Sequence, residues 1–153
     1  MAQLSMLESM ARECTKPGLP LVIAEFGWYG GGDLPNQKSG SAKPATEEQQ
    51  ARWCQRLVEV TAPLACGWLN WGMYDHPEAK DVSVFTGLFT AEGKEKAWGR
   101  TFQQLALRFQ AIPPSFAFPN RPDLPWDECI VDGDAMERFR LSYLAACKTA
   151  VAP

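Results

Sequence analysis

The sequence predicts an α/β fold in which helices alternate with short parallel strands. Two short, almost wholly apolar runs, LPLVIAE at residues 19–25 and ACGWLNW at residues 65–71, lie between segments whose apolar residues recur with a helical period. A strand without polar alternation is typical of a parallel sheet that is covered on both faces. The order helix, strand, helix, strand, helix is that of parallel strands joined by crossover helices.

The first predicted helix covers residues 2–15, where Leu4, Leu7, Ala11 and Cys14 share one face, and the KPG sequence at residues 16–18 ends it. The first predicted strand follows at residues 19–25. Residues 27–45 are rich in Gly, Pro, Ser and Lys and are predicted to form a long loop. A loop of that length inside a compact domain is usually functional or disordered.

The second predicted helix begins after Thr46, because TEEQ at residues 46–49 has the pattern of a capping box, and Pro63 ends it. The second predicted strand covers residues 65–71. A tight turn at residues 92–93 and a helix over about residues 95–110 come next. The strand–helix units repeat at about 45 residues, near the repeat length of an eight-stranded barrel of such units.

The chain is predicted to divide into residues 1–110, which carry the alternating helices and strands, and residues 111–153. Five prolines in residues 111–126 predict an extended, semi-rigid connector, and a last helix is predicted over about residues 133–147. Two parallel strands cannot close a barrel, so the edges of these strands stay unpaired.

Composition excludes several functions. The 153 residues are 46% hydrophobic and 22% charged, and the formal net charge is −3 without a basic stripe, so neither nucleic acid nor an anionic membrane is an expected partner. The five cysteines contain no CxxC pair, and His76 is the single histidine, so we expect free buried thiols and no metal site or cofactor. The first residues lack the core of a signal peptide, and the compartment stays undetermined.

Glu25 and Trp71 are the main candidate site residues, because each ends a predicted strand. Leu21, Ile23 and Glu25 are expected on one face, and if that face lines a barrel, Glu25 lies at the C-terminal mouth, where barrel enzymes hold catalytic groups. The alternative is a glutamate that is solvated or paired with an arginine. Trp71 would offer an apolar platform to a sugar ring, or be packed in the core like Trp68, which is predicted to lie under a helix.

Four loop residues are further candidates. Trp28 and Tyr29 either line a cleft beside Glu25 or pin the glycine-rich loop, and Asp75 and His76 either reach a substrate or close the loop after the second strand. The glycines at residues 30–32 lack the spacing of a phosphate-binding loop. The sequence contains no GxSxG motif that would supply a hydrolase triad.

Several segments resemble retaining glycoside hydrolases of clan A, especially the cellulase-like family five. PLVIAEFGW at residues 20–28 resembles the seventh barrel strand of that family, whose terminal glutamate is the nucleophile. EEQQARW at residues 47–53 resembles the helix that follows, and GWLNW at residues 67–71 resembles the eighth strand, whose tryptophan floors the reacting sugar. TGLFTAEG at residues 86–93 and KAW at residues 96–98 resemble the passage into the last helix.

The resemblance covers about residues 1–110 and implies strands seven and eight of the barrel, with Glu25 as the nucleophile and Trp71 as the sugar platform. The acid/base glutamate of the family follows an asparagine, and no Asn-Glu pair occurs here. Asp33, Asp75 and Glu78 are loop carboxylates that no motif marks for this role.

The resulting hypothesis is a fragment of a retaining β-glycosidase that acts on a β-linked glucan, mannan or similar glycoside, with carbohydrate as its partner and no complete catalytic pair of its own. The open strand edges predict association with the missing part of the barrel or with a second copy. One alternative is a non-catalytic carbohydrate-binding or assembly module. Another is a structural remnant that aggregates when it is isolated.

Overall fold

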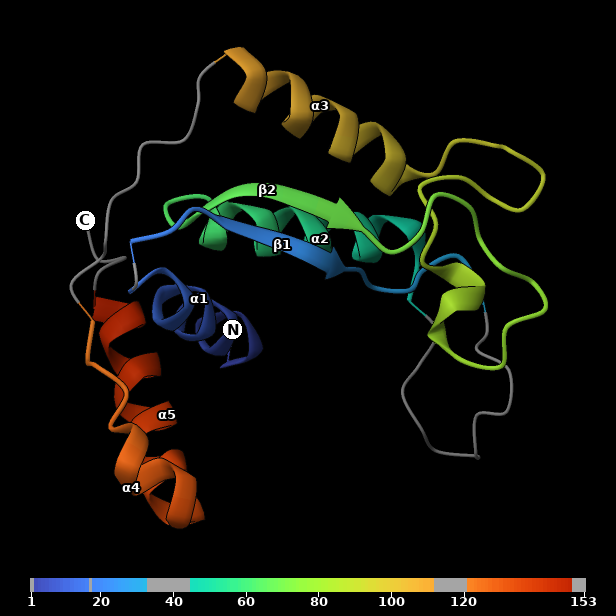
Figure 1. The fold of residues 1–153 in the computed structure, drawn as a ribbon. Coiled ribbons are helices and arrows are strands. Elements are labelled where there is room, and N and C mark those ends of the chain that lie inside the picture. The colour runs from blue at the N-terminus through green and yellow to red at the C-terminus, as the bar shows by residue number, and fades with distance from the viewer. Residues whose placement is uncertain (1, 17, 33–44, 112–120, 150–153) are drawn as a thin grey trace.

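A computed structural model describes residues 2–16, 18–32, 45–111 and 121–149 (Figure 1). Over these ranges the elements follow the predicted alternation: α1 (Ala2–Thr15), β1 (Leu21–Phe26), α2 (Glu47–Thr61), β2 (Ala65–Asn70), the 3-10 helix η1 (Val82–Phe85), α3 (Ala97–Ala111), α4 (Trp126–Val131) and α5 (Gly133–Thr149). Figure 1 shows the two strands in the centre, with α2 behind them, α3 above and α1 below. No helix of the described ranges has the length and apolar character that crossing a bilayer requires.

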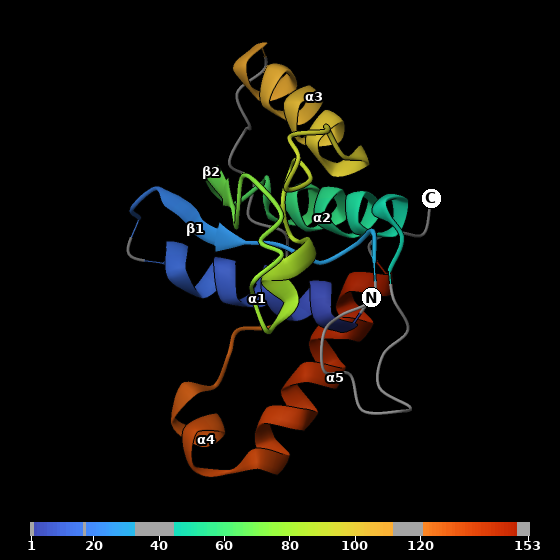
Figure 2. The ribbon, with the colours of Figure 1, turned by 90° about the vertical axis from the view of Figure 1, so that its right-hand side faces the viewer.

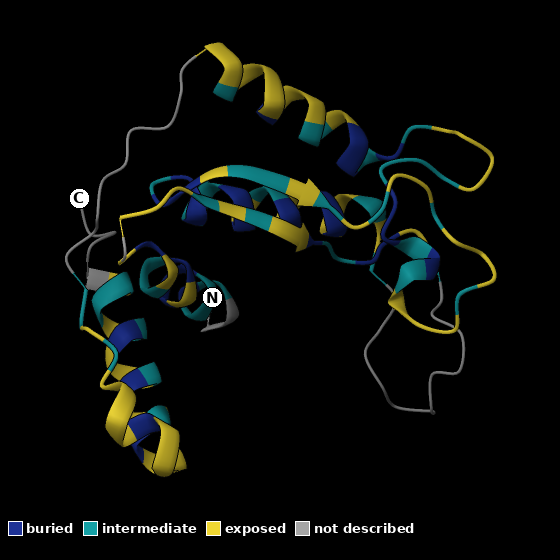
Figure 3. Cartoon of the chain, in the orientation of Figure 1, coloured by how far each residue is buried: buried dark blue, intermediate teal, exposed yellow. Residues whose placement is uncertain are grey.

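The two strands are parallel, as predicted, and α2 forms the crossover between them. Val22 pairs with Gly67 and Ile23 with Trp68, and the register shifts between Ile23 and Phe26. One face of the sheet is covered by helices α2 and α3, and Leu4 and Leu7 of α1 pack against the same core. The other face is open, and Figure 3 shows its strands largely in the colours of exposed and intermediate residues.

The prediction that Leu21, Ile23 and Glu25 share one face of the strand is wrong. Ile23 packs against the core under the helices, whereas Glu25 is exposed and lines a surface pocket with Trp71. The register shift between Ile23 and Phe26 breaks the strict alternation of side chains, because an irregular position moves the following residues out of phase. Glu25 therefore reaches the side of Trp71 although Ile23 lies on the opposite side.

The main core lies between the sheet and helices α2 and α3. Its buried members are Phe26, Ala51, Cys54, Leu57, Val58, Trp98 and Leu105. Trp98 is fully buried, meets Phe26 edge to face, and donates its indole hydrogen to Asn70 Oδ1 at 2.8 Å. Trp68 stacks on Phe109 with ring centroids 5.0 Å apart, so its predicted place under a helix is confirmed.

Helix α2 begins as the sequence predicts. The Thr46 side chain accepts a hydrogen bond from the Gln49 backbone N–H at 3.2 Å, and the Gln49 side chain accepts one from the Thr46 backbone N–H at 2.8 Å. This capping box is confirmed. The adjoining loop is described only in part, because residues 33–44 lie outside the described ranges.

Helices α4 and α5 pack on each other around a second, smaller core of Cys129, Ala135, Phe139 and Tyr143, and α5 also contacts α1. Figure 2 shows α4 and α5 grouped beside α1, on the side away from α3. The Glu8 carboxylate of α1 accepts hydrogen bonds from Arg121 Nε at 3.0 Å and from the Tyr143 hydroxyl at 3.2 Å. The last helix is as predicted, the short α4 was not expected, and residues 112–120 of the connector lie outside the described ranges.

All five cysteines are free thiols. Cys54 and Cys129 are buried as expected and Cys147 is half-buried, but Cys14 and Cys66 are exposed, so burial was wrongly expected for these two. Cys14 lies near the end of α1. Cys66 lies in the two-stranded sheet, one face of which is not covered by any described helix. In the part of the chain that the structure describes, no three His, Cys, Asp or Glu side chains gather into a metal-binding group.

Candidate functional site

A pocket of about 370 Å³ lies where the C-terminal ends of β1 and β2 meet the loop that follows β2. It is lined by Glu25, Phe26, Gly27, Trp71, Asp81, Val82, Ser83 and Thr86. The C-terminal ends of parallel strands are where α/β folds bind ligands. The structure thus brings together Glu25 and Trp71, which come from different strands.

Backbone contacts fix Trp71 against the end of β1. The Trp71 N–H donates to the Phe26 carbonyl at 2.7 Å, directly after Glu25. A Cβ atom at Gly27 would lie 2.7 Å from the Trp71 carbonyl oxygen, so only glycine permits this close approach. The Trp71 side chain remains 53% exposed and is available to a ligand.

The outer wall of the pocket comes from η1 and its flanking residues. The Trp71 indole Nε1 donates to Ser83 Oγ at 3.3 Å, and Asp81 Oδ1 accepts from the Ser83 backbone N–H at 2.8 Å. This backbone hydrogen bond lowers the pKa of the exposed Asp81 carboxyl, which is therefore ionised at neutral pH.

The Asn70 side chain stabilises this wall through hydrogen bonds. Its Nδ2 donates to the Gly72 carbonyl at 2.9 Å and to the Thr86 carbonyl at 3.2 Å, while its Oδ1 accepts from Trp98. Sequence reasoning missed Asn70, Asp81 and Ser83 as site residues. The Asp-Val-Ser order at residues 81–83 was the available signal, since an aspartate often caps the N–H two residues ahead.

Asp75 lies outside the pocket and closes the loop. Lys96 Nζ contacts its two carboxylate oxygens at 2.8 and 3.0 Å, and the Gly87 N–H donates to Oδ1 at 2.8 Å. Burial raises the pKa of Asp75, and the hydrogen bond and charge of Lys96 oppose that rise. Of the two roles considered for Asp75, its contacts are those of loop closure.

His76 is exposed and contributes its backbone to the same loop. Its N–H donates to the Ser83 carbonyl at 3.2 Å, and its carbonyl accepts from Ala79 at 2.9 Å. The side chain is not among the residues that line the pocket. Glu78 is also exposed and outside the pocket, and Asp33 lies outside the described residues.

Trp28 and Tyr29 pin the glycine-rich loop to α2. The Trp28 ring stacks between Tyr29, at a centroid distance of 5.2 Å, and Trp53 of α2, at 4.9 Å. The Trp28 carbonyl accepts from the buried Gln50 side chain at 2.7 Å. Neither ring lines the pocket that contains Glu25.

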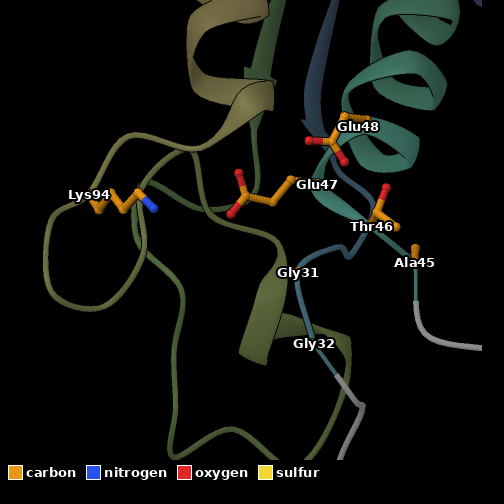
Figure 4. A pocket seen from close by; sticks show the side chains of 7 residues that line it. All are labelled: Gly31, Gly32, Ala45, Thr46, Glu47, Glu48 and Lys94. Carbon is orange, nitrogen blue, oxygen red and sulfur yellow. The ribbon is translucent and has the colours of Figure 1, made fainter.

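A second pocket of about 560 Å³ lies beside the glycine loop and is lined by Gly31, Gly32, Ala45, Thr46, Glu47, Glu48 and Lys94 (Figure 4). Glu47 is already engaged, because its Oε2 accepts from the Ala97 N–H at 3.0 Å at the start of α3. Two glutamates at this pocket make it unsuited to phosphate, which agrees with the missing phosphate-loop pattern. None of the residues predicted for the site lines this second pocket.

In sequence, the chain matches no protein-family model and no curated protein. In fold, it is similar to a GH5_18 protein from Bifidobacterium longum subsp. longum ATCC 55813, solved in complex with Manβ1-4GlcNAc, with a TM-score of 0.55 and 20% identity over 74% of this chain and 26% of that one. A β-glucuronidase from Faecalibacterium prausnitzii gives a TM-score of 0.51 and 22% identity over 75% of this chain and 19% of that one.

These proteins are glycoside hydrolases, and the chain spans about a quarter or less of their length, at 26% and 19%. The identities of 20% and 22% make the likeness one of fold. The chain therefore has the fold of part of a (β/α)8 barrel, as the sequence predicted.

Proposed function

We propose that this chain is the nucleophile-bearing part of a retaining β-glycosidase. One observation carries the proposal: Glu25 and Trp71, from two parallel strands, line a single pocket at the C-terminal ends of those strands. A carboxylate beside an exposed indole is the combination that a sugar ring needs for attack at its anomeric carbon and for stacking of its C–H face. The resemblance of both strands to family five supports the same assignment.

In the proposed reaction, Glu25 attacks the anomeric carbon and the leaving group departs. The Glu25 carboxylate and the sugar are then joined in a covalent glycosyl ester. Water then cleaves the ester with overall retention of configuration. A second carboxylic acid must protonate the leaving oxygen and later accept a proton from the water. The substrate is a β-linked glucan, mannan or similar glycoside.

The second carboxylic acid is not assigned within the described residues. Asp81 lines the pocket, but its pKa is lowered, whereas a general acid needs a raised one. We propose that another segment of the barrel supplies this group. The isolated chain is then expected to leave ordinary aryl β-glycosides intact.

The test uses a substrate whose leaving group departs without being protonated. An activated dinitrophenyl glycoside of a fluoro-sugar, in the gluco and manno forms, is incubated with the full chain and the intact mass is measured. We expect a covalent adduct that maps to Glu25 and is absent in Glu25→Gln, with folding of both proteins checked by circular dichroism. A folded wild-type chain that forms no adduct with either sugar overturns the proposal. Turnover of ordinary aryl glycosides that Glu25→Ala abolishes would show that the chain carries its own acid.

A second candidate function is a non-catalytic carbohydrate-binding module. The 53% exposure of Trp71 favours it, since a flat exposed indole binds a sugar without any acid/base group. Glucan affinity that is lost in Trp71→Ala and kept in Glu25→Ala, together with no adduct at Glu25, would favour this function.

A further inference from the structure

We infer that Asp81 and Ser83 select the sugar at this pocket, by binding the hydroxyl groups of an uncharged ring stacked on Trp71 and by excluding glycosides that carry a carboxylate. The inference rests on the proposed function, because it takes the pocket of Glu25 and Trp71 as the sugar site. It adds a specificity role for two residues of the loop after β2.

The geometry places polar groups at the edge of the indole. Ser83 Oγ accepts the Trp71 Nε1 hydrogen at 3.3 Å, so the serine hydroxyl lies beside the ring. Its proton is directed to the Asp81 carboxylate, and its second lone pair can accept from a sugar hydroxyl. A sugar that stacks on an indole turns its C–H groups to the ring face and its hydroxyls outward. The Ser83 hydroxyl lies where such outward hydroxyls would be.

The Asp81 carboxylate is held at the same rim. Its Oδ1 accepts the Ser83 backbone N–H at 2.8 Å, which fixes the side chain over the start of η1 instead of leaving it to rotate in solvent. Sugar hydroxyls are hydrogen-bond donors, and a bond to an ionised acceptor is about twice as strong as one between neutral groups. Asp81 is therefore suited to bind a hydroxyl of a neutral sugar.

The charge of the lining argues against an anionic sugar. Among the eight described residues that line the pocket, Glu25 and Asp81 are carboxylates and none is lysine or arginine. Lys96 is buried and committed to Asp75, and Lys80, beside Asp81 in the sequence, is exposed and outside the lining. A uronate would bring a third negative charge into a lining that holds no lysine or arginine to balance it, which is unfavourable.

The experiment titrates the full isotope-labelled chain with methyl β-glucoside, methyl β-mannoside and methyl β-glucuronide, and follows the Trp71 indole N–H by NMR. We expect at least one neutral glycoside to bind about tenfold more tightly than the glucuronide at low salt. Asp81→Asn should reduce this preference to less than about threefold. Added salt should reduce it in the wild type, because screening weakens the repulsion.

Glu78→Gln is the matched control, since Glu78 is an exposed carboxylate of the same loop outside the pocket. It should keep the wild-type preference, and backbone amide spectra verify that each variant is folded. A wild-type preference below threefold, an unchanged preference in Asp81→Asn, or no response of the Trp71 indole to any glycoside would each overturn the inference. The adduct at Glu25 is measured independently, so its presence with any of these results leaves the proposed function standing.

Discussion

Lys96 Nζ lies 2.8 Å from Asp75 Oδ1, in an ion pair whose lysine side chain is 1% exposed and whose aspartate side chain is 10% exposed. The pair joins the residue before α3 to the loop after β2, and Lys96 also donates to the Phe85 carbonyl at 3.0 Å. Asp81, Val82, Ser83 and Thr86 of that loop form the outer wall of the pocket. The wall is therefore held by charges that lie outside the pocket.

Lys96→Met is expected to lower the free energy of unfolding by about 3 kcal/mol, because removing one partner leaves a poorly solvated carboxylate without its cation. The loss should shrink as the pH falls toward the pKa of Asp75, which burial already raises and which the substitution raises further. Urea unfolding at several pH values measures both effects.

Lys94→Met is the control for Lys96→Met, because Lys94 is an exposed lysine two residues away. It should change the free energy of unfolding by less than about 0.5 kcal/mol. An equal effect of the two substitutions would mean that the pair with Asp75 does not hold the loop.

Gly99 and Gly133 both lie in helices and are expected to respond to alanine in opposite ways. A Cβ atom at Gly99 would lie 2.4 Å from the Leu88 carbonyl oxygen, whereas a Cβ atom at Gly133 meets nothing within 4 Å. Gly99→Ala should destabilise the chain by about 1–3 kcal/mol through overpacking. Gly133→Ala should be neutral or stabilise it by up to about 1 kcal/mol through helix propensity.

Thermal unfolding followed by circular dichroism compares these two alanine variants. Gly133→Ala serves as the matched control for the generic effect of replacing a helical glycine. A rise of the melting temperature in Gly99→Ala would show that α3 does not approach Leu88 as closely as the structure has it.

The features that were predicted correctly depend on short sequence patterns and on the order of helices and strands. The capping box at Thr46 and Gln49 depends on four consecutive residues, and its pattern is specific. Topology places Glu25 and Trp71 at the same edge of the sheet, because parallel strands end at the same edge. These features need no knowledge of side-chain packing.

The remaining features depend on contacts that no local pattern encodes. The shared face of Ile23 and Glu25 was predicted from strict alternation, and the register shift after Ile23 overrides it. Asn70 and Trp98 are 28 residues apart, and Asp75 and Lys96 are 21 apart, so their hydrogen bonds appear only when α3 packs on the sheet. The stacking of Trp28 on Trp53 is likewise a long-range contact, and it holds the glycine-rich loop against α2.

Tyr143 is expected to make the chain sensitive to alkali. Its hydroxyl is buried and donates to Glu8 Oε1 at 3.2 Å, and burial, followed by the negative charge of Glu8, raises the pKa of Tyr143. Above pH of about 10 the unfolded chain releases this proton while the folded chain retains it. The stabilising effect is therefore present below that pH and is lost as the pH rises further.

Melting temperatures between about pH 8 and 11 test this sensitivity in the wild type and in Tyr143→Phe, whose melting temperature should fall less steeply. Tyr74→Phe is the control, because Tyr74 is 55% exposed, and it should keep the wild-type slope. The same slope in all three proteins would contradict the burial of the Tyr143 hydroxyl.

The open face of the sheet is expected to cause self-association of the isolated chain. Val22 is 47% exposed and Leu69 is 54% exposed, and both lie on strands whose outer edges have no partner among the described residues. Apolar side chains next to unpaired strand edges favour association with other chains. Sedimentation velocity over a range of concentrations should show reversible association, and Leu69→Lys should weaken it at least about fivefold.

Leu107→Lys is the matched control, because Leu107 is 60% exposed on α3, away from the open face. It should leave the association unchanged, since charge added outside the contact affects only long-range repulsion. A wild-type chain that stays monomeric at all concentrations would exclude a second copy as the partner of this face. The other strands of a barrel would then be the remaining partner predicted for the open face. A polypeptide that contains those strands should bind the wild-type chain more tightly than it binds Leu69→Lys.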